Sequence, residues 1–307
     1  MIDMSETDNI QNLVTPETKT GSDEKKMSSY TGQEKPYVSY YGDAMNDNNV
    51  NDLVDDTIPH VVILVGFPEY GKSTFVSSFY HAVMKNGQIG NYQFVDSETI
   101  FGFEQRAHIR KVETKTKKRL DRTPVYANYF LSMVFVNKKT ERKVKLVLSD
   151  RAGDTYKDYV TIGQRINDDK ALNRAKHILF FLDAHALTGD GFLEMQQNLG
   201  LLISRMGNYG AFGDNKRVDV VFNKSDLVDV NSETFKTNRE VIIKQISRAT
   251  TIHREDNLHC TNVPNNEEIN RYFEYLLESC EEPVENSEDL IRKTDWVSSK
   301  LKEIEKR

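Results

Sequence analysis

The chain has 307 residues, with 41 Lys+Arg, 47 Asp+Glu and a formal net charge of −6. Its two cysteines, Cys260 and Cys280, exclude a disulfide framework and zinc sites of the CxxC type. The apolar runs are far too short to cross a bilayer, and the first residues lack the basic and apolar regions of a signal peptide. We therefore expect a cytoplasmic protein without a membrane span.

The first 56 residues differ in composition from the rest of the chain. Residues 1–57 contain 12 Asp+Glu and 4 Lys+Arg, and they are rich in Asn, Ser and Thr. A segment of this composition buries too little apolar surface to offset the entropy of ordering. We expect residues 1–56 to form a disordered acidic tail.

Beyond the tail, strand and helix patterns follow one another. Residues 60–65 begin with a histidine and continue as an apolar, mostly β-branched run, which is typical of a parallel strand buried on both faces. A helix is predicted from about Lys72, because apolar residues recur at helical spacing up to the stop signal Asn86-Gly87. Two strands at residues 125–136 and 143–148, joined by a polar turn, predict a hairpin.

Further strands are predicted at residues 178–182, 218–222 and 258–261, with helices at residues 192–206 and 267–280. Because strands alternate with helices and include one hairpin, we expect residues 57–280 to form a three-layer α/β/α domain. Its sheet should be mostly parallel, with one antiparallel strand.

The first strand leads directly into a glycine-rich motif. Residues 66–73 fit the pattern GxxxxGK[ST], and they lie between a predicted strand and a predicted helix. Backbone N–H groups of such a loop and the helix N-terminus bind phosphates, the lysine contacts the β- and γ-phosphates, and the serine hydroxyl holds Mg²⁺. The expected phosphate-binding residues are Gly66, Glu69, Tyr70, Gly71, Lys72, Ser73 and Thr74.

A second motif ends the strand at residues 143–148. Asp150 follows this strand, and Gly153 lies three residues further on. A carboxylate at this place can hold Mg²⁺ through a water, and a glycine lets its N–H approach the γ-phosphate closely. Asp and Gly also end many strands in plain turns. The position one hairpin after the phosphate loop favours the nucleotide site.

A third motif, Asn223-Lys224-Ser225-Asp226, closes the strand at residues 218–222. The Asp226 carboxylate can accept hydrogen bonds from guanine N1–H and the N2 amino group, a pair of donors that adenine lacks. Asn223 and the Lys224 stem would hold the loops around the base. The alternative is that Ser225 or Asp226 is the N-cap of a helix. Three motifs in this order, each after a strand, favour a guanine nucleotide.

These three motifs in this order resemble those of Ras-like GTPases of the TRAFAC class, over roughly residues 57–280. Residues 94–106, followed by Arg122-Thr123-Pro124, are similar to the bacterial, conflict-system-associated double-GTPase proteins. The resemblance implies a P-loop NTPase fold of the Ras-like type, GTP hydrolysis with Mg²⁺, and a protein effector or activating partner. It also implies a switch threonine at the γ-phosphate and Mg²⁺. The candidates are Thr114, Thr116 and Thr123, and Thr123 is favoured because a strand follows it directly.

The chain departs from the Ras-like pattern at two places. Asp154 stands where Ras-like proteins have a water-orienting Gln, and an ionised Asp only accepts hydrogen bonds. Three functions therefore stay open: a GTPase switch in which Lys72, Thr123 and Asp154 are catalytic, a guanine-nucleotide-binding module with little hydrolysis, and a P-loop ATPase. The loop that completes the guanine site has no clear motif, and we place it at Cys260-Thr261-Asn262.

Two further segments are charged. Residues 110–122 hold seven basic residues, which we interpret as a solvated switch loop rather than a nucleic-acid surface, because no aromatic residues interleave for base stacking. Arg119 or Arg122 could act there as an arginine finger in cis. Residues 281–307 carry apolar residues at helical spacing, which predicts an amphipathic helix that packs on its own domain or on a partner.

Overall fold

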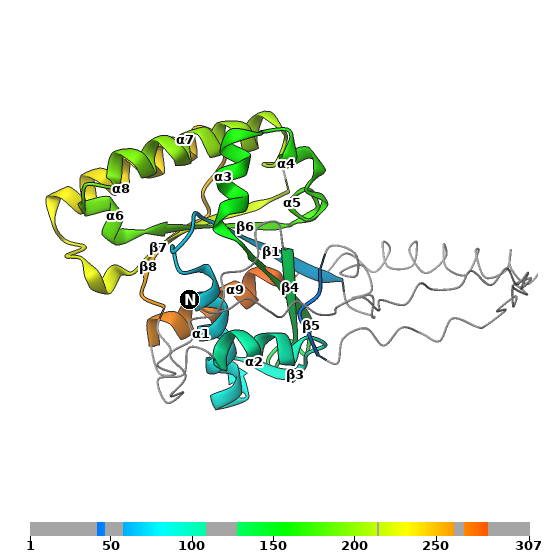
Figure 1. Ribbon diagram of the computed structural model, residues 1–307. Coiled ribbons are helices and arrows are strands. Elements are labelled where there is room, and N and C mark those ends of the chain that lie inside the picture. Colours follow the sequence, from blue (N-terminus) through cyan, green and yellow to red (C-terminus); the bar gives the residue numbers. More distant parts are fainter. Residues whose placement is uncertain (1–41, 47–57, 109–127, 214, 261–266, 282–307) are drawn as a thin grey trace, which may run out of the picture. The chain divides into compact units, whose positions relative to one another are not determined.

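The computed structural model describes residues 42–46, 58–108, 128–213, 215–260 and 267–281, which include an eight-stranded sheet with helices on both faces (Figure 1). The strands are β1 (Pro59–Val65), β2 (Gln88–Ile89), β3 (Tyr92–Asp96), β4 (Asn128–Asn137), β5 (Lys143–Arg151), β6 (His177–Asp183), β7 (Arg217–Asn223) and β8 (Arg254–Leu258). The helices are α1 (Lys72–Asn86), α2 (Ile100–His108), α3 (Gly153–Thr161), α4 (Arg165–Asp168), α5 (Lys170–Arg174), α6 (Ala184–Thr188), α7 (Phe192–Asn208), the 3₁₀ helix η2 (Ser225–Leu227), α8 (Glu233–Ser247) and α9 (Glu267–Cys280).

The sheet has the strand order β2-β3-β4-β5-β1-β6-β7-β8. Strands β5, β1, β6, β7 and β8 pair in parallel, and β4 runs antiparallel to β5. The predicted α/β fold with a mostly parallel sheet is therefore confirmed. Its antiparallel part is larger than expected, because β3 pairs with β4 and the two-residue β2 pairs with β3. Sequence patterns do not predict β2, which has two residues, or β3, in which Tyr92 is the one fully buried residue.

Most predicted elements lie where the patterns put them. The strands predicted at residues 60–65, 143–148, 178–182 and 218–222 fall within β1, β5, β6 and β7, and the two later helices fall within α7 and α9. The prediction for the last strand is wrong by several residues, because β8 ends at Leu258, where the predicted strand begins. The first four residues of β8 are polar and only half-buried, so their hydropathy carries no strand signal.

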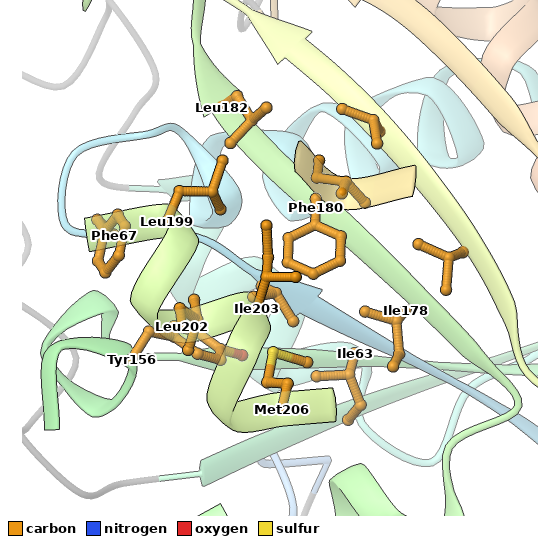
Figure 2. Close-up of a cluster of buried hydrophobic side chains, with 14 of the residues drawn as sticks. Ile63, Phe67, Tyr156, Ile178, Phe180, Leu182, Leu199, Leu202, Ile203 and Met206 are labelled. Carbon is orange, nitrogen blue, oxygen red and sulfur yellow. The ribbon is translucent and has the colours of Figure 1, made fainter. Parts of the chain in front are cut away.

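Strand β1 is buried on both faces, as its apolar run predicts. Ile63 and Val65 belong to a core beneath α3, α7 and α8, part of which Figure 2 shows. Val62 and Leu64 belong to a second core that contains residues of α1, α2 and α9. Because successive side chains of a strand point to opposite faces, these two cores define three layers. The loop after β1 is thus anchored by the centre of the sheet.

Aromatic side chains fix α1, the helix that follows the phosphate loop. The ring of Phe75 lies 5.0 Å from that of Phe181 on β6 and 5.2 Å from that of Phe273 on α9. Phe79, one turn later, lies 4.9 Å from Phe273. These edge-to-face pairs hold α1 between the sheet and α9. They therefore position the N-terminus of α1.

A short segment of the expected tail packs on this domain. Met45 and Phe130 of β4 exchange two backbone hydrogen bonds of 3.0 and 2.8 Å, and Met45 is 3% exposed. A Cβ atom on Gly102 would lie 2.5 Å from the nitrogen of Ala44, so α2 packs closely on the same segment. The expectation of disorder over residues 1–56 is therefore wrong for residues 42–46. Composition averages over a window and does not detect one apolar residue that enters a core.

Helix α9 also contacts the edge of the sheet. Glu274 accepts hydrogen bonds of 3.0 Å from both the backbone N–H and the side-chain amide of Asn91, and Glu281 accepts one of 3.1 Å from the hydroxyl of Tyr92. None of the helices in the described part of the chain has the length and apolar character needed to cross a membrane. The basic segment at residues 110–122 and the predicted helix beyond Glu281 lie outside the described residues.

Candidate nucleotide-binding site

Three loops meet at the carboxyl end of the parallel strands. They follow β1, β5 and β7, which are far apart in the sequence but share one edge of the sheet. A Cβ atom on Gly71 would lie 2.0 Å from the side-chain nitrogen of Asn223, and one on Gly153 would lie 2.1 Å from the nitrogen of Pro68. The phosphate loop is therefore in contact with both the second and the third motif.

The loop after β1 presents the N-terminus of α1. Gly71 is the N-cap and has a φ of 92°, a left-handed conformation that favours glycine. Gly71 has no side chain with which to cap this helix end, and the N-terminus of a helix attracts an anion through its N–H groups and dipole. Gly66 lies against β6, where a Cβ atom would be 2.7 Å from the carbonyl oxygen of Phe181. Glu69 also has a positive φ of 68° and is exposed.

The ammonium group of Lys72 turns back onto its own loop. Its Nζ donates to the carbonyl oxygens of Gly66, at 2.5 Å, and Phe67, at 3.1 Å. Burial lowers the pKa of Lys72 to about 8, while the carboxylates of Asp150 and Asp154 act in the opposite direction. Carbonyl dipoles stabilise a buried cation less well than an anionic partner would. A phosphate bound in this loop would stabilise the charged form of Lys72.

A hydroxyl and a carboxylate lie side by side next to this loop. The Oγ of Ser73 donates to Oδ1 of Asp150 at 2.8 Å, and Asp150 is 2% exposed. Such oxygen atoms fit Mg²⁺, which binds proteins through one or two side chains and takes further oxygens from water and phosphate. The described residues contain no group of three or more His, Cys, Asp or Glu side chains that could hold a metal ion. A divalent ion at Ser73 and Asp150 would take its remaining oxygens from water and from the phosphates of a nucleotide.

The second oxygen of Asp150 has an unexpected partner. Arg106, on the last turn of α2, donates from Nε to Oδ2 of Asp150 at 2.5 Å. Sequence reasoning assigns Arg106 no role, because it is separated from Asp150 by 44 residues and belongs to none of the three motifs. No spacing rule links the two residues, and only the fold brings them together.

Asn223 joins two loops of the site. Its side-chain Nδ2 donates to the carbonyl oxygen of Tyr70 at 3.0 Å, and its Oδ1 accepts from the backbone N–H of Cys260 at 3.1 Å. Asn223 is 2% exposed, so water does not replace these bonds. The segment after β8 therefore lies beside the guanine motif, as expected for Cys260. Thr261 and Asn262 are outside the described residues.

The rest of the third motif is arranged around η2. Lys224 has a positive φ of 62° and donates from Nζ to Oδ2 of Asp183 at 2.5 Å. The Asp226 side chain is exposed, where it can accept hydrogen bonds from a ligand. The alternative that Ser225 or Asp226 caps the next helix is wrong, because the N-cap of α8 is Ser232, which accepts from the N–H of Phe235.

Comparison with protein families gives the same result as these motifs. The family model of double-GTPase 2 matches residues 60–276, which is more than half of the chain. The chain belongs to the double-GTPase 2 family. The matched range includes all three motifs, and the resemblance to double-GTPase proteins that the sequence indicates is confirmed. Family membership supports binding of a guanine nucleotide.

Comparisons with individual proteins add distant likenesses. The putative nucleolar GTP-binding protein 1 of Plasmodium falciparum is 16% identical, with a TM-score of 0.38, and the match covers 80% of this chain and 99% of that one. The small GTPase Arl6 of Trypanosoma brucei, with bound GppNp, is 10% identical, with a TM-score of 0.37 and coverage of 73% and 98%. Translation elongation factor SelB of Methanococcus maripaludis, with GppNHp, is 14% identical, with a TM-score of 0.38 and coverage of 75% and 36%. No curated protein matches the chain.

In this double-GTPase 2 domain, Asp154 lies in the first turn of α3, next to the phosphate loop. Its side chain is one-third exposed, and Oδ1 lies 4.0 Å from Nζ of Lys157. This loose contact leaves the carboxylate able to accept a hydrogen bond from a water. The switch threonine expected at Thr123, and Thr114 and Thr116 as its alternatives, lie outside the described residues, as do Arg119 and Arg122.

A buried ion pair anchors the segment that carries Asp154. Arg151 donates to Asp169 from both terminal nitrogens, with Nη2 at 2.9 Å from Oδ1, and the hydroxyl of Tyr159 donates to Oδ2 at 2.6 Å. Burial by itself would raise the pKa of Asp169, but the charge and hydrogen bonds of Arg151 outweigh it, and the pKa is lowered. The same carboxylate caps α5 by accepting from the N–H of Leu172 at 2.9 Å. The Asp169 carboxylate thereby joins β5, α3 and α5.

Proposed function

We propose that this protein binds GTP with Mg²⁺ and hydrolyses it to GDP and phosphate, as a nucleotide-dependent switch with a protein effector or activating partner. The observation that carries the proposal is the contact of three loops, Gly71 with Asn223 and Gly153 with Pro68, at one edge of the sheet. A single ligand with a triphosphate and a purine ring can contact all of them.

The phosphate end is assigned to the loop after β1. The N–H groups at the start of α1 and the ammonium of Lys72 bind the β- and γ-phosphates. The proposed phosphate-binding residues are Gly66, Glu69, Tyr70, Gly71, Lys72, Ser73, Thr74 and Gly153. Ser73, Asp150 and Thr123 hold Mg²⁺, directly or through water. When bound, Mg²⁺ neutralises charge on the phosphate oxygens.

The base end is assigned to the loops after β7 and β8. The exposed Asp226 carboxylate accepts from N1–H and the N2 amino group of guanine. Asn223 fixes this loop to the phosphate loop through its bond to Tyr70, so the distance between the base and phosphate subsites is set. Lys224, the next residue, is held by its bond to Asp183. An adenine ring would leave the Asp226 carboxylate without its donors.

In the hydrolytic step, water attacks the γ-phosphorus in line, the bond to the β–γ bridging oxygen breaks, and GDP and phosphate result. Asp154 positions the water by accepting one of its hydrogen bonds, and Thr123 contacts the γ-phosphate, as the resemblance to Ras-like GTPases implies. Lys72 offsets negative charge that develops on the bridging oxygen. Its burial favours this role, because charge–charge interactions are stronger away from water.

The second candidate is a binding module that holds GTP or GDP and barely hydrolyses it. The observation that favours it is Asp154 itself, which lacks the N–H donors of a glutamine amide and is near Lys157. Single-turnover measurements with Mg²⁺-GTP separate the two candidates. Product GDP supports the switch enzyme, whereas GTP recovered intact supports the binding module.

The guanine assignment has its own test. In Asp226→Asn, the amide can donate to the 2-oxo group of xanthine but repels the 2-amino group of guanine, so we expect preference to move from GDP to XDP. We expect GDP affinity to fall by at least tenfold, which corresponds to about 1.4 kcal/mol. Calorimetry with GDP, XDP and ADP measures this. Equal binding of GDP and ADP by the wild-type protein would overturn the guanine assignment and favour a P-loop ATPase.

A further inference from the structure

The Arg106–Asp150 ion pair lies at the centre of the proposed metal site. Arg106 Nε and Asp150 Oδ2 are 2.5 Å apart, and both side chains are less than 10% exposed. Ser73 occupies Oδ1 of the same carboxylate at 2.8 Å. The carboxylate therefore has a hydroxyl donor on one oxygen and a cation on the other. A buried carboxylate needs such a partner, because an uncompensated charge is costly to bury.

Several contacts hold Arg106 in this position. Its Nη1 donates to the carbonyl oxygen of Gly102 at 2.9 Å, and the guanidinium lies 4.9 Å from the centre of the Tyr129 ring. The hydroxyl of Ser77 on α1 donates to the Arg106 carbonyl oxygen at 3.2 Å. Elements α1, α2 and β4 thus place the guanidinium on Asp150. Because the planar guanidinium of Arg106 is contacted on several sides, the fold itself fixes its position on Asp150.

We propose that Arg106 and Mg²⁺ compete for Asp150, so that the guanidinium neutralises this carboxylate until metal and nucleotide arrive together and displace it. The inference rests on the proposed function, which assigns Mg²⁺ to Ser73 and Asp150. Two cations on one buried carboxylate repel each other, and Lys72 adds a third positive charge nearby. The phosphates of the nucleotide supply the negative charge that lets Mg²⁺ displace Arg106.

The competition gives α2 a role in the nucleotide cycle. Arg106 is in the last turn of α2, and its bond to Asp150 links that helix to β5. Once Mg²⁺ displaces the guanidinium, this link is lost and the end of α2 is held by fewer bonds. The opposite arrangement, in which Arg106 stays on Asp150 and orients it for the metal, would strengthen the link. These two arrangements predict Mg²⁺ effects of opposite sign.

The first experiment compares the metal affinity of the full chain with that of Arg106→Gln, and uses Arg165→Gln, from a half-exposed pair with Asp158, as the matched control. Binding of Mn²⁺ to the GDP-bound protein is followed by electron paramagnetic resonance. In parallel, Mg²⁺ is titrated against the release rate of a fluorescent GDP. We expect Arg106→Gln to tighten Mn²⁺ binding and to lower the half-maximal Mg²⁺ concentration by about tenfold, the size of a typical coupling between two bound groups. Arg165→Gln should behave as the wild type.

The second experiment needs no variant and therefore does not depend on whether Arg106→Gln folds. Hydrogen exchange of α2 in the wild-type chain is measured with GDP, with and without Mg²⁺. We expect Mg²⁺ to speed exchange in the last turn of α2. Slower or unchanged exchange, or weaker or unchanged metal binding by Arg106→Gln, would overturn the competition. Failure of the wild type to bind GDP would instead refute the proposed function, whereas GDP binding without the expected metal effects would refute the competition alone.

Discussion

Asn223 offers the sharpest test of how the site is assembled. Its side-chain amide bonds to the phosphate loop, at the Tyr70 carbonyl, and to the loop after β8, at the Cys260 N–H. Among the described residues no other side chain joins these two loops by hydrogen bonds. The Asn223→Ala substitution removes both bonds, one at the carbonyl of Tyr70 and one at the N–H of Cys260. It changes no charge and no residue proposed to touch the phosphates.

The expected magnitude follows from these two groups. A buried polar group that loses its partner costs about 1–3 kcal/mol. Because Tyr70 and Cys260 are partly exposed, the lower part of this range applies to each. We expect the free energy of unfolding to fall by about 2–3 kcal/mol. We also expect GDP affinity to fall by at least about tenfold, since the loops are no longer fixed relative to one another.

Asn238→Ala is the matched control. Asn238 makes one half-buried hydrogen bond, from its Nδ2 to the carbonyl oxygen of Leu187, outside the three loops. Its loss should lower the free energy of unfolding by about 1 kcal/mol and leave GDP affinity unchanged. Urea unfolding and calorimetric GDP titration of both variants measure the two quantities. Equal effects of Asn223→Ala and Asn238→Ala would refute the view that Asn223 organises the site.

Two further predictions concern stability. Asp169→Ala leaves the buried Arg151 without its counter-charge, so we expect urea unfolding to show a free energy of unfolding lower by about 3–5 kcal/mol. The control Asp158→Ala breaks a more exposed pair and should lower it by about 0–1 kcal/mol. Similar losses in both variants would contradict this prediction. Burial, followed by the charge of His177, lowers the pKa of His60 to about 3, so on acidification below pH 6.5 the unfolded chain takes up a proton that the folded protein does not. The free energy of unfolding should therefore fall by about 1.4 kcal/mol for each pH unit below 6.5 because of His60. When urea unfolding is compared between pH 6.5 and 5, His60→Gln should remove this contribution from the dependence of the free energy of unfolding on pH. An unchanged slope would show that His60 is not buried in its neutral form.

The local sequence predicts those parts of the fold whose signal lies in neighbouring residues. The apolar run of β1 and the helical spacing of Phe75 and Phe79 predict a strand and a helix, because burial on both faces of a strand or on one face of a helix requires such patterns. The short helices α4, α5 and α6 and the polar strand β8 carry no comparable pattern. Their positions depend on contacts such as the cap that Asp169 gives to α5.

The same division holds for the candidate site. The motifs around Gly71, Asp150 and Asn223 are recognisable because each loop needs particular residue types at fixed spacing to meet a phosphate, a metal or a base. The sequence by itself therefore determined the three loops and their order along the chain. Only the tertiary structure decided that Arg106 would lie on Asp150 and that Met45 would pair with Phe130. Contacts between residues far apart in the chain have no periodicity and no fixed spacing, so folding alone brings them together.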